Sequence, residues 1–304
     1  MKFFDILPLA SAELALQCSM HEERQFALVT ATSGTSIRVL QSRFPINLAT
    51  GARAAGDKAI TKALLIGCRH PVVNGCSVNL GVDWQVAFEC FSKLGGRAIV
   101  KPTNGERGTL VFLCRSAGQL AFALSQIVHK HGSAMIEEYI EGTEYRILIL
   151  DSKPLYVLER QKLSLQTDGT STIVDLIARQ APTLLPTLLA DPRMSQMAGT
   201  PPLTTVLPAG VPFIPIPAAN SAAAQTLSID PSTCPSIVNL AASAVATLGL
   251  RYAGVDLIVE RKTDQTYLLE VNSAPELEGF DSHGEPSLGA AVTACRALLS
   301  ACFS

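Results

Sequence analysis

Oxygen-bearing side chains interrupt an apolar segment near the C-terminal end of the sequence. The stretch YLLEVNSAPELEGF spans residues 267–280, with Glu270 and Asn272 two residues apart. Alternate residues of a β-strand point to the same face, so we expect Glu270 and Asn272 to share one side with Leu268. The segment alone does not separate a solvated polar strand edge from a pair of oxygen ligands aimed into a site.

The preceding segment brings a second carboxylate into the same region. RYAGVDLIVE (251–260) predicts a strand, and the polar residues after it predict the turn of a hairpin. With a five-residue loop, Glu260 pairs with Thr266 and Asp256 falls opposite Glu270. Opposed residues have Cβ atoms about 4.5–5.5 Å apart, so the two carboxylates repel each other unless a cation is present.

Asp256, Glu270 and Asn272 together predict a metal site. They offer hard oxygen ligands without a nearby Cys or His, which suits Mg²⁺ or, as the alternative, Mn²⁺. Such ions are usually held by one or two carboxylates together with substrate phosphates. We therefore expect a metal-dependent phosphate chemistry at this hairpin.

Composition limits the classes of function. The 304 residues carry a net charge of −2, which argues against a nucleic-acid surface, and no apolar run reaches transmembrane length. The N-terminal stretch resembles a secretory signal, but Asp5 interrupts it, so we expect folded structure there. The eight cysteines lack C-x-x-C spacing and predict reduced, mostly buried thiols in a cytoplasmic protein.

Periodicity and capping signals predict alternating helices and strands, and hence an α+β fold. The expected helices cover 57–67, 84–96, 116–131, 171–180 and 237–248. The expected strands cover 97–102, 108–114, 134–140 and a hairpin of 145–150 with 155–160.

Residues 163–235 differ from the rest of the chain. They contain eleven prolines and six charged residues, too apolar for a disordered linker and too rich in proline for regular elements. We expect this stretch to be a long insertion that covers a site.

A second group of polar residues precedes the insertion. Lys101 ends a predicted strand, and the loop NGERG (104–108) carries Gly105 and Gly108, whose backbone N–H groups could surround phosphates. Taken alone, this loop would more often be a plain hairpin turn than a phosphate-binding loop, and no Walker motif is present. The segment 137–144 could offer backbone groups to a base and a carboxylate to a ribose, or merely solvated charges.

These motifs, in this order, resemble the ATP-grasp enzymes over residues 56–295. The motifs shared with D-alanine–D-alanine ligases and ribosomal-protein glutamate ligases are DKAITK (57–62), VKP (100–102), EEYI (137–140) and LEVN (269–272). Those similar to the ATP-grasp module of cyanophycin synthetase and bifunctional glutathione synthetases are GTEYRILIL (142–150), DGTSTIVDLI (168–177) and LPAGVPF (207–213).

The resemblance implies an ATP-grasp fold in which ATP lies between two antiparallel-sheet lobes. The expected domains are a small N-terminal region (1–76), a central lobe (77–136) and a C-terminal lobe (137–304) that holds the insertion 163–235. A stand-alone relative is expected, because the chain lacks the second catalytic halves of the bifunctional enzymes.

The resemblance also implies roles for individual residues. For ATP these are Lys58, Lys101, Gly105 and Gly108 at the phosphates, Glu137, Glu138, Tyr139 and Ile140 at the adenine, and Glu144 at the ribose. For two Mg²⁺ ions they are Asp256, Glu270 and Asn272. Arg146 and Arg160, with Lys101, would steady the transferring phosphate, although each arginine alone equally fits a surface ion pair.

The sequence departs from the family at places that concern the substrate. Gly254–Val255 replaces an arginine found before the metal Asp in D-alanine ligases, and Pro275–Glu276 replaces a Pro-Gly pair. After LPAGVPF the chain keeps Asn220 and Ser221 as candidate substrate residues but lacks the arginine of cyanophycin-like proteins. These changes weaken any assignment of glutathione precursors or a cyanophycin chain as the substrate.

The implied activity is an ADP-forming carbon–nitrogen ligase. A small amino-acid-derived carboxylate would become an acyl phosphate and then react with an amine, with lactam formation within one molecule as a minority option. The alternatives are an ATP-grasp carboxylase or kinase and a non-catalytic nucleotide-binding module. A homodimer, the two substrates, the general base and the role of residues 1–55 are left open by the sequence.

Overall fold

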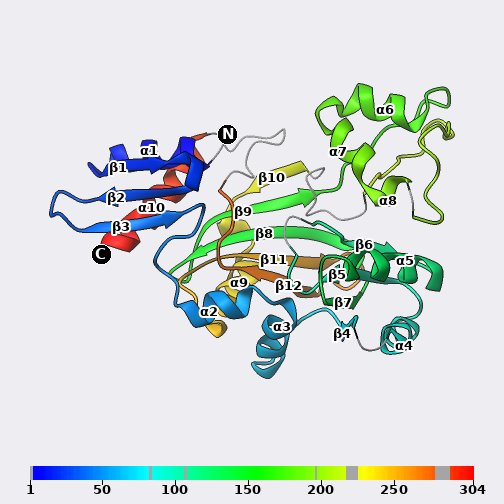
Figure 1. The fold of residues 1–304 in the computed structure, drawn as a ribbon, viewed down its shortest axis with the longest axis horizontal. Coiled ribbons are helices and arrows are strands. Elements are labelled where there is room, and N and C mark those ends of the chain that lie inside the picture. Colours follow the sequence, from blue (N-terminus) through cyan, green and yellow to red (C-terminus); the bar gives the residue numbers. More distant parts are fainter. Residues whose placement is uncertain (1–2, 82–83, 106–107, 196, 217–224, 278–287) are drawn as a thin grey trace. The chain divides into compact units, whose positions relative to one another are not determined.

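The computed structural model of the chain describes residues 3–81, 84–105, 108–195, 197–216, 225–277 and 288–304. Its strands form three sheets with the orders β1-β2-β3, β4-β7-β5-β6 and β10-β9-β8-β11-β12 (Figure 1). The chain divides into two compact units. Unit 1 comprises Met1–Val72, Gly142–Glu159 and Thr226–Ser304, and unit 2 comprises Val73–Glu141 and Arg160–Gln225.

The described helices belong to both units. The α-helices are α1 (Phe3–Glu13), α2 (Ala49–Ala55), α3 (Lys58–Gly67), α4 (Gln85–Lys93), α5 (Ala117–Val128), α6 (Ile173–Gln180), α7 (Leu185–Ala190), α8 (Pro192–Ser195), α9 (Pro235–Thr247) and α10 (Leu288–Phe303). The 3₁₀-helices are η1 (Glu22–Arg24), η2 (Pro182–Leu184) and η3 (Pro231–Thr233).

The strands are short in the two smaller sheets and longest in the third. They are β1 (Gln17–His21), β2 (Phe26–Thr30), β3 (Ser36–Leu40), β4 (Gly75–Asn79), β5 (Ala98–Pro102), β6 (Phe112–Cys114), β7 (Ser133–Glu138), β8 (Gly142–Leu150), β9 (Lys153–Gln161), β10 (Gln225–Ile229), β11 (Tyr252–Glu260) and β12 (Thr266–Asn272).

Both faces of the five-stranded sheet of unit 1 contribute residues to hydrophobic cores. Alternate residues of β8 enter different cores: Ile147 and Ile149 pack in one cluster with α9, while Leu148 and Leu150 pack in the other with α1 and α10. This explains why the second half of β8, residues 147–150, reads as a continuous apolar run in the sequence. β11 lies beside β8 and pairs with it in antiparallel register along its whole length (Figure 1).

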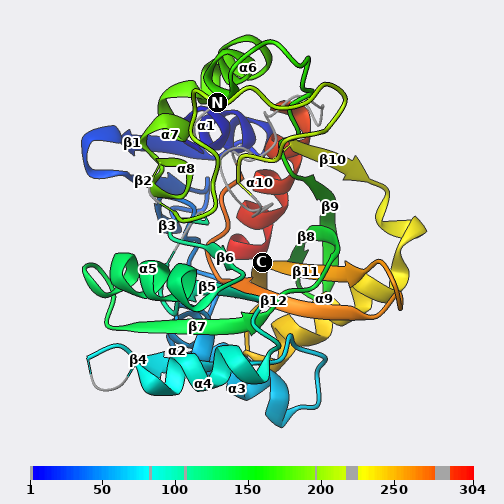
Figure 2. The same cartoon turned by 90° about the vertical axis from the view of Figure 1, so that its right-hand side faces the viewer.

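The N-terminal residues complete the second of these cores. α1 packs against α10, and both lie beside the small sheet β1-β2-β3 (Figure 2). Phe3 and Phe44 meet edge to face, as do Phe44 and Tyr252 of β11. The segment that resembles a secretory signal is thus folded, as predicted, and belongs to the core. Among the described residues no helix combines the length and apolar character needed to cross a membrane.

Unit 2 holds the four-stranded sheet, against which α4 and α5 pack. The prediction that all cysteines are reduced thiols was wrong, because Cys76 of β4 and Cys90 of α4 form a disulfide with Cα atoms 6.6 Å apart. A separation of 14 residues follows no short motif, and only the packing of α4 on β4 brings the two together. One of the grounds for expecting a cytoplasmic location is therefore removed.

The proline-rich residues 163–235 divide between the units: the part up to Gln225 is counted with unit 2 and the rest with unit 1. The helix predicted for 171–180 is present as α6, which packs its apolar face into a local core. The domain boundaries expected from the sequence stay a prediction.

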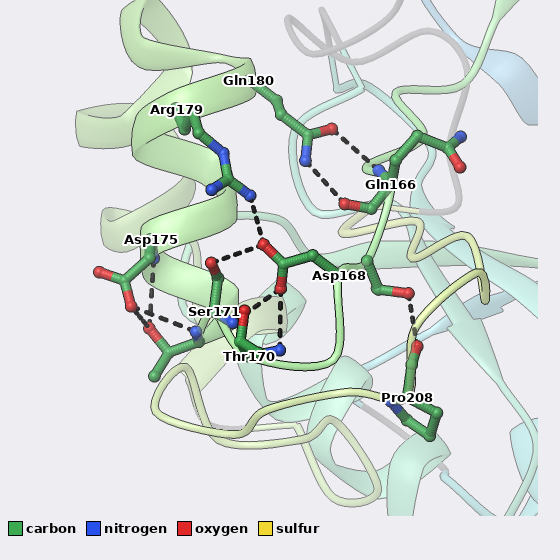
Figure 3. Close-up of polar contacts among 10 residues, drawn as sticks. Gln166, Asp168, Thr170, Ser171, Asp175, Arg179, Gln180 and Pro208 are labelled. Atoms are coloured by element: carbon green, nitrogen blue, oxygen red, sulfur yellow. Dashed lines mark hydrogen bonds and ion pairs between the residues drawn. The ribbon is translucent and has the colours of Figure 1, made fainter.

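Asp168 anchors the loop that leads into α6 (Figure 3). Its carboxylate accepts hydrogen bonds from the backbone N–H groups of Thr170 and Ser171, the Ser171 hydroxyl and the Arg179 guanidinium, over 2.7–2.9 Å. The bond from the Ser171 N–H, followed by that from Arg179, holds the pKa of Asp168 well below its usual range. Asp168 thus stabilises the loop of the insertion that leads into α6.

Side-chain hydrogen bonds cap the N-terminal ends of two other helices. Asp57 begins α3 and accepts hydrogen bonds from the N–H groups of Ala59 and Ile60. Ser116 begins α5 and accepts from the N–H of Gln119, but the Gln119 side chain accepts from Arg115 rather than from Ser116. α5 also ends at Val128, three residues before the predicted end.

Substitution of Gly142 tests how closely the backbones of β8 and β11 approach each other. A Cβ atom there would lie 2.1 Å from the Val259 carbonyl oxygen, whereas one at Gly67, at the end of α3, would meet nothing within 4 Å. We expect Gly142→Ala to lower the free energy of unfolding by about 1–3 kcal/mol, and Gly67→Ala to leave it unchanged or raise it by up to about 1 kcal/mol. Urea unfolding of both variants measures this, and equal stabilities would contradict the close approach.

Candidate functional site

Three charged residues lie in a row across neighbouring strands of unit 1. The register pairs Asp256 of β11 with Arg146 of β8 on one side and with Glu270 of β12 on the other. The predicted opposition of Asp256 and Glu270 is therefore confirmed. β11 is the central strand of the three, so its carboxylate is flanked by a cation and by a second carboxylate.

The route to this opposition differs from the predicted one. Thr266 pairs with Val259, not with Glu260, and the register shifts by one residue at a β-bulge where Leu269 has no partner. Leu268 consequently packs in the core with Val271 rather than sharing a face with Glu270, so that prediction was wrong. An extra residue in one strand reverses the alternation beyond it, which turns Glu270 away from the core.

Each of the two carboxylates has a cationic partner. Arg146 donates from Nε and Nη2 to the two oxygens of Asp256, both at 2.7 Å, and Lys58 Nζ lies 3.1 Å from Glu270 Oε1. Burial alone lowers the pKa of Arg146, but Asp256 and, more weakly, Tyr156 and Glu270 raise it above its usual value. The four side chains form a largely buried network in which each carboxylate is paired with one cation.

Lys58 owes its position to the start of α3. It is the first residue of that helix, directly after the capping Asp57. The backbone N–H of Leu268 also donates to the carbonyl of Pro71, which follows α3 closely and ties it to β12. The helix cap and this strand contact together place the lysine beside Glu270.

Asn272 ends β12 opposite Gly254 of β11. Its Oδ1 accepts a hydrogen bond of 2.9 Å from the N–H of Ala274, which curls the chain into the following loop. A Cβ atom at Gly254 would lie 2.8 Å from Pro275 Cβ, so the glycine is required for that loop to pass close to β11. Gly254, two residues before Asp256, thus has a structural reason to be small.

The arrangement fits a hard divalent cation. A carboxylate has four lone-pair directions, of which Arg146 uses two at Asp256. In the part of the chain that the structure describes, no three His, Cys, Asp or Glu side chains gather as a metal cluster, so a metal would rest on Asp256, Glu270 and Asn272. Few protein ligands plus phosphate oxygens are typical of Mg²⁺.

A second charged pair lies in unit 2. Lys101 Nζ of β5 is 2.6 Å from Glu137 Oε2 of β7, and the side chains are only 9% and 7% exposed. β5 and β7 are adjacent, with Ile99 opposite Glu137, so the lysine reaches the carboxylate diagonally across the sheet. Two residues predicted for different parts of the nucleotide are therefore in direct contact.

The residues after Glu137 differ in their surroundings. The backbone N–H of Glu138 donates to the carbonyl of Asn74, which occupies it in strand pairing. Beyond the end of β7, the Arg97 guanidinium lies 4.0 Å from the centroid of the Tyr139 ring, and Lys162 Nζ lies 5.7 Å from it. Ile140 is half-buried.

The predicted phosphate loop has an unexpected support. The carbonyls of Gly108 and Val111 accept hydrogen bonds from Arg193 Nη1, at 3.3 and 2.8 Å. Arg193 is buried and also pairs with Asp191. Sequence reasoning missed this arginine, although its place beside an aspartate in a segment so poor in charge was a signal.

Four further predicted residues lie in or close to strands of the described chain. Glu144 of β8 lies opposite Ile258 and is half-buried, and Arg160 lies in β9, also half-buried. Gly105 is described, with a Cβ position 3.2 Å from Pro102 Cγ, and Gly108 has a positive φ of 66°. The substrate candidates Asn220 and Ser221 lie outside the described residues.

No family model matches the chain, but curated relatives do. Cyanophycin synthetase of Synechocystis sp. is 27% identical over 304 residues, which cover 92% of this chain and 32% of the synthetase. The glutathione biosynthesis bifunctional protein GshAB of Streptococcus mutans is 32% identical over 131 residues, covering 42% of this chain and 17% of that protein. The chain thus spans about a third, or less, of the length of these relatives.

Solved structures show the fold. D-alanine–D-alanine ligase from Bacillus anthracis has a TM-score of 0.56 at 18% identity, covering 84% of this chain and 69% of that one. The ATP-grasp ligase PsnB, complexed with Mg and ADP, has a TM-score of 0.52 at 16% identity over 83% of this chain and 60% of its own. The α+β ATP-grasp fold and the resemblance predicted from the motifs are confirmed.

Two arginine–aspartate pairs provide a matched test of the network in unit 1. In the Arg146–Asp256 pair the side chains are 18% and 7% exposed, and in the Arg251–Asp151 pair 49% and 44%. Arg146→Gln leaves a buried carboxylate without its cation, and we expect a loss of about 3–5 kcal/mol in the free energy of unfolding. Arg251→Gln should cost about 0–1 kcal/mol.

Denaturant unfolding without divalent metal measures both variants. Similar losses for the two would show that Asp256 does not depend on Arg146 for its charge.

Proposed function

We propose that this chain, which has the ATP-grasp fold, is an ATP-dependent ligase that activates a carboxylate as an acyl phosphate and joins it to an amine. ADP and phosphate would be released. The observation that carries the proposal is the row Arg146, Asp256 and Glu270, with Lys58 beside it. The known relatives and the fold support the same class of chemistry.

Phosphoryl transfer needs positioning and neutralisation of charge more than covalent help from the protein. A magnesium ion held by Asp256, Glu270 and Asn272 would supply positive charge at the phosphate oxygens. Lys101 would add a point charge, as the resemblance implies, and Arg146 a planar guanidinium able to bind two oxygens at once. No step in this scheme requires a protein nucleophile.

The ion pairs of three cationic side chains suggest how the site is prepared for a nucleotide. Lys58, Lys101 and Arg146 each bind a carboxylate, at distances of 2.6–3.1 Å. The phosphates of a bound nucleotide would give these three side chains other anions to bind. A divalent cation at Asp256 and Glu270 would then replace the positive charge that Arg146 and Lys58 no longer supply to the two carboxylates. The same donors would thus serve first the folded protein and then the substrate.

The charges of the proline-rich insertion bear on the substrate. Four of its six charged residues pair with each other, Asp168 with Arg179 and Asp191 with Arg193. Little net charge is left to attract a polyanion. We therefore propose a small amino-acid-derived carboxylate and a small amine, with cyclisation of a single molecule as a variant of the same chemistry.

Two other functions would use the same fold. A carboxylase or kinase would release ADP without forming an amide, and a non-catalytic module would bind ATP without turnover. The retention of Asp256, Glu270 and their cations argues against the module, because a buried charge network is costly to keep without use. Product analysis separates all three.

Removal of either opposed carboxylate should abolish turnover. We expect Asp256→Asn and Glu270→Gln each to lower kcat at least about a hundredfold at saturating Mg²⁺, since several kcal/mol of charge stabilisation are lost. Asp264→Asn, in the exposed turn of the same hairpin, is the matched control and should keep its activity. ADP release measures the rates, and a normal rate in either carboxylate variant would refute the metal assignment.

The substrate proposal is tested with a panel of amino acids, dipeptides and acidic peptides. We expect ADP release with small amino-acid-derived compounds and an amide-containing product detected by mass spectrometry. A response confined to acidic polypeptides would show that the insertion does not restrict the substrate as proposed.

A further inference from the structure

Asn47 makes four hydrogen bonds with its side chain. It lies between β3 and α2, in the part of the sequence to which no role was assigned. Its Nδ2 donates to the carbonyls of Tyr252 and Ser273, at 2.7 and 3.1 Å. Its Oδ1 accepts from the N–H groups of Arg251 and Tyr252, at 3.0 and 2.9 Å.

These bonds use the whole hydrogen-bonding capacity of the amide. A carboxamide has two N–H donors and two acceptor lone pairs, and all four are engaged here. The partners also fix the orientation, because a flipped amide would face two N–H groups with its own N–H groups. Asn47 therefore joins three segments: its own, the start of β11 and the loop that follows β12.

Asn47 is one of three side chains that bind consecutive carbonyls of that loop. The carbonyl of Ser273 accepts from Asn47, that of Ala274 from Ser42 Oγ at 3.0 Å, and that of Pro275 from Tyr252 Oη at 3.3 Å. Ser42 is buried, and the Tyr252 side chain is fully enclosed. A loop held at three successive peptide groups has little freedom to shift.

The held loop determines where Asn272 points. Its Oδ1 accepts the N–H of Ala274, so one lone pair is directed into the loop and the other has a defined direction. If the loop moved, the amide oxygen of Asn272 would move with it. Partners that orient a metal-binding side chain usually change metal affinity about 10–100-fold when they are removed.

We infer that Asn47, assisted by Ser42, is a positioning residue for the metal-binding end of β12. This rests on the proposed function, because it takes Asn272 as a ligand of the divalent cation. Asn47 touches neither metal nor substrate. It acts by holding the residue 273–275 loop, and through that loop the Asn272 oxygen.

The test measures direct binding of Mn²⁺ in the presence of ADP. The concentration of free Mn²⁺ is determined from its electron paramagnetic resonance signal. We expect Asn47→Ala to weaken Mn²⁺ binding about tenfold and to raise by a similar factor the Mg²⁺ concentration for half-maximal ADP release. Asn47→Asp keeps the two acceptor bonds but loses both donors, so it should not rescue binding. Asn239→Ala, in an exposed position of α9, is the control and should bind Mn²⁺ as the unchanged protein does.

Ser42→Ala removes a single hydrogen bond and carries the test if the Asn47 variants fold poorly. A folded Asn47 variant or Ser42→Ala protein that binds Mn²⁺ within twofold of the unchanged protein would overturn the inference. Asp256→Asn distinguishes this from failure of the proposed function. If the unchanged protein binds no Mn²⁺, or Asp256→Asn binds it normally, the metal site itself is wrong.

Discussion

Two like charges face each other across neighbouring strands, and much of unit 1 is arranged around them. Asp256 and Glu270 are tolerable in a partly buried place only because cations reach them from both sides. Arg146 comes from the strand on one side, and Lys58 from a helix whose start is fixed by its cap. The sheet order and the position of α3 thus both place a cation beside one of the two carboxylates.

Much of this fold could be predicted because its signals are local. The Asp57 cap, the β8–β9 hairpin and the helices of the central lobe follow from turn chemistry and periodicity over a few residues. The bulge at Leu269 and the Cys76–Cys90 disulfide could not be predicted, since both depend on packing between elements. Residues 1–55 were also uninformative, because their role lies in contacts with β11 and α10, far along the chain.

The candidate site shows the same division. The types of its charged residues and their order along the chain were sufficient to predict the fold and the opposition of Asp256 and Glu270, while the metal at this hairpin stays a prediction. The partners were not, because a motif shows that Lys101 and Glu137 are present but not that they bind each other. Arg193 and Asn47 carry no motif at all. Arg193 matters because it binds backbone carbonyls, and Asn47 because it binds a loop. Such contacts produce no periodic pattern in the sequence.

The bulge at Leu269 puts the two ends of β12 out of phase. Before the bulge, Leu268 packs in the core that contains α9. After the bulge, Val271 packs in that core, and Glu270 lies on the opposite, polar side of the strand. The direction in which each side chain points depends on its pairing with β11 and not on which residue stands at position 269. The strand should therefore accept many side chains at that position. It should also accept the loss of that position, since deleting Leu269 leaves a regular alternation in which Leu268 and Val271 still face the core and Glu270 still lies opposite Asp256.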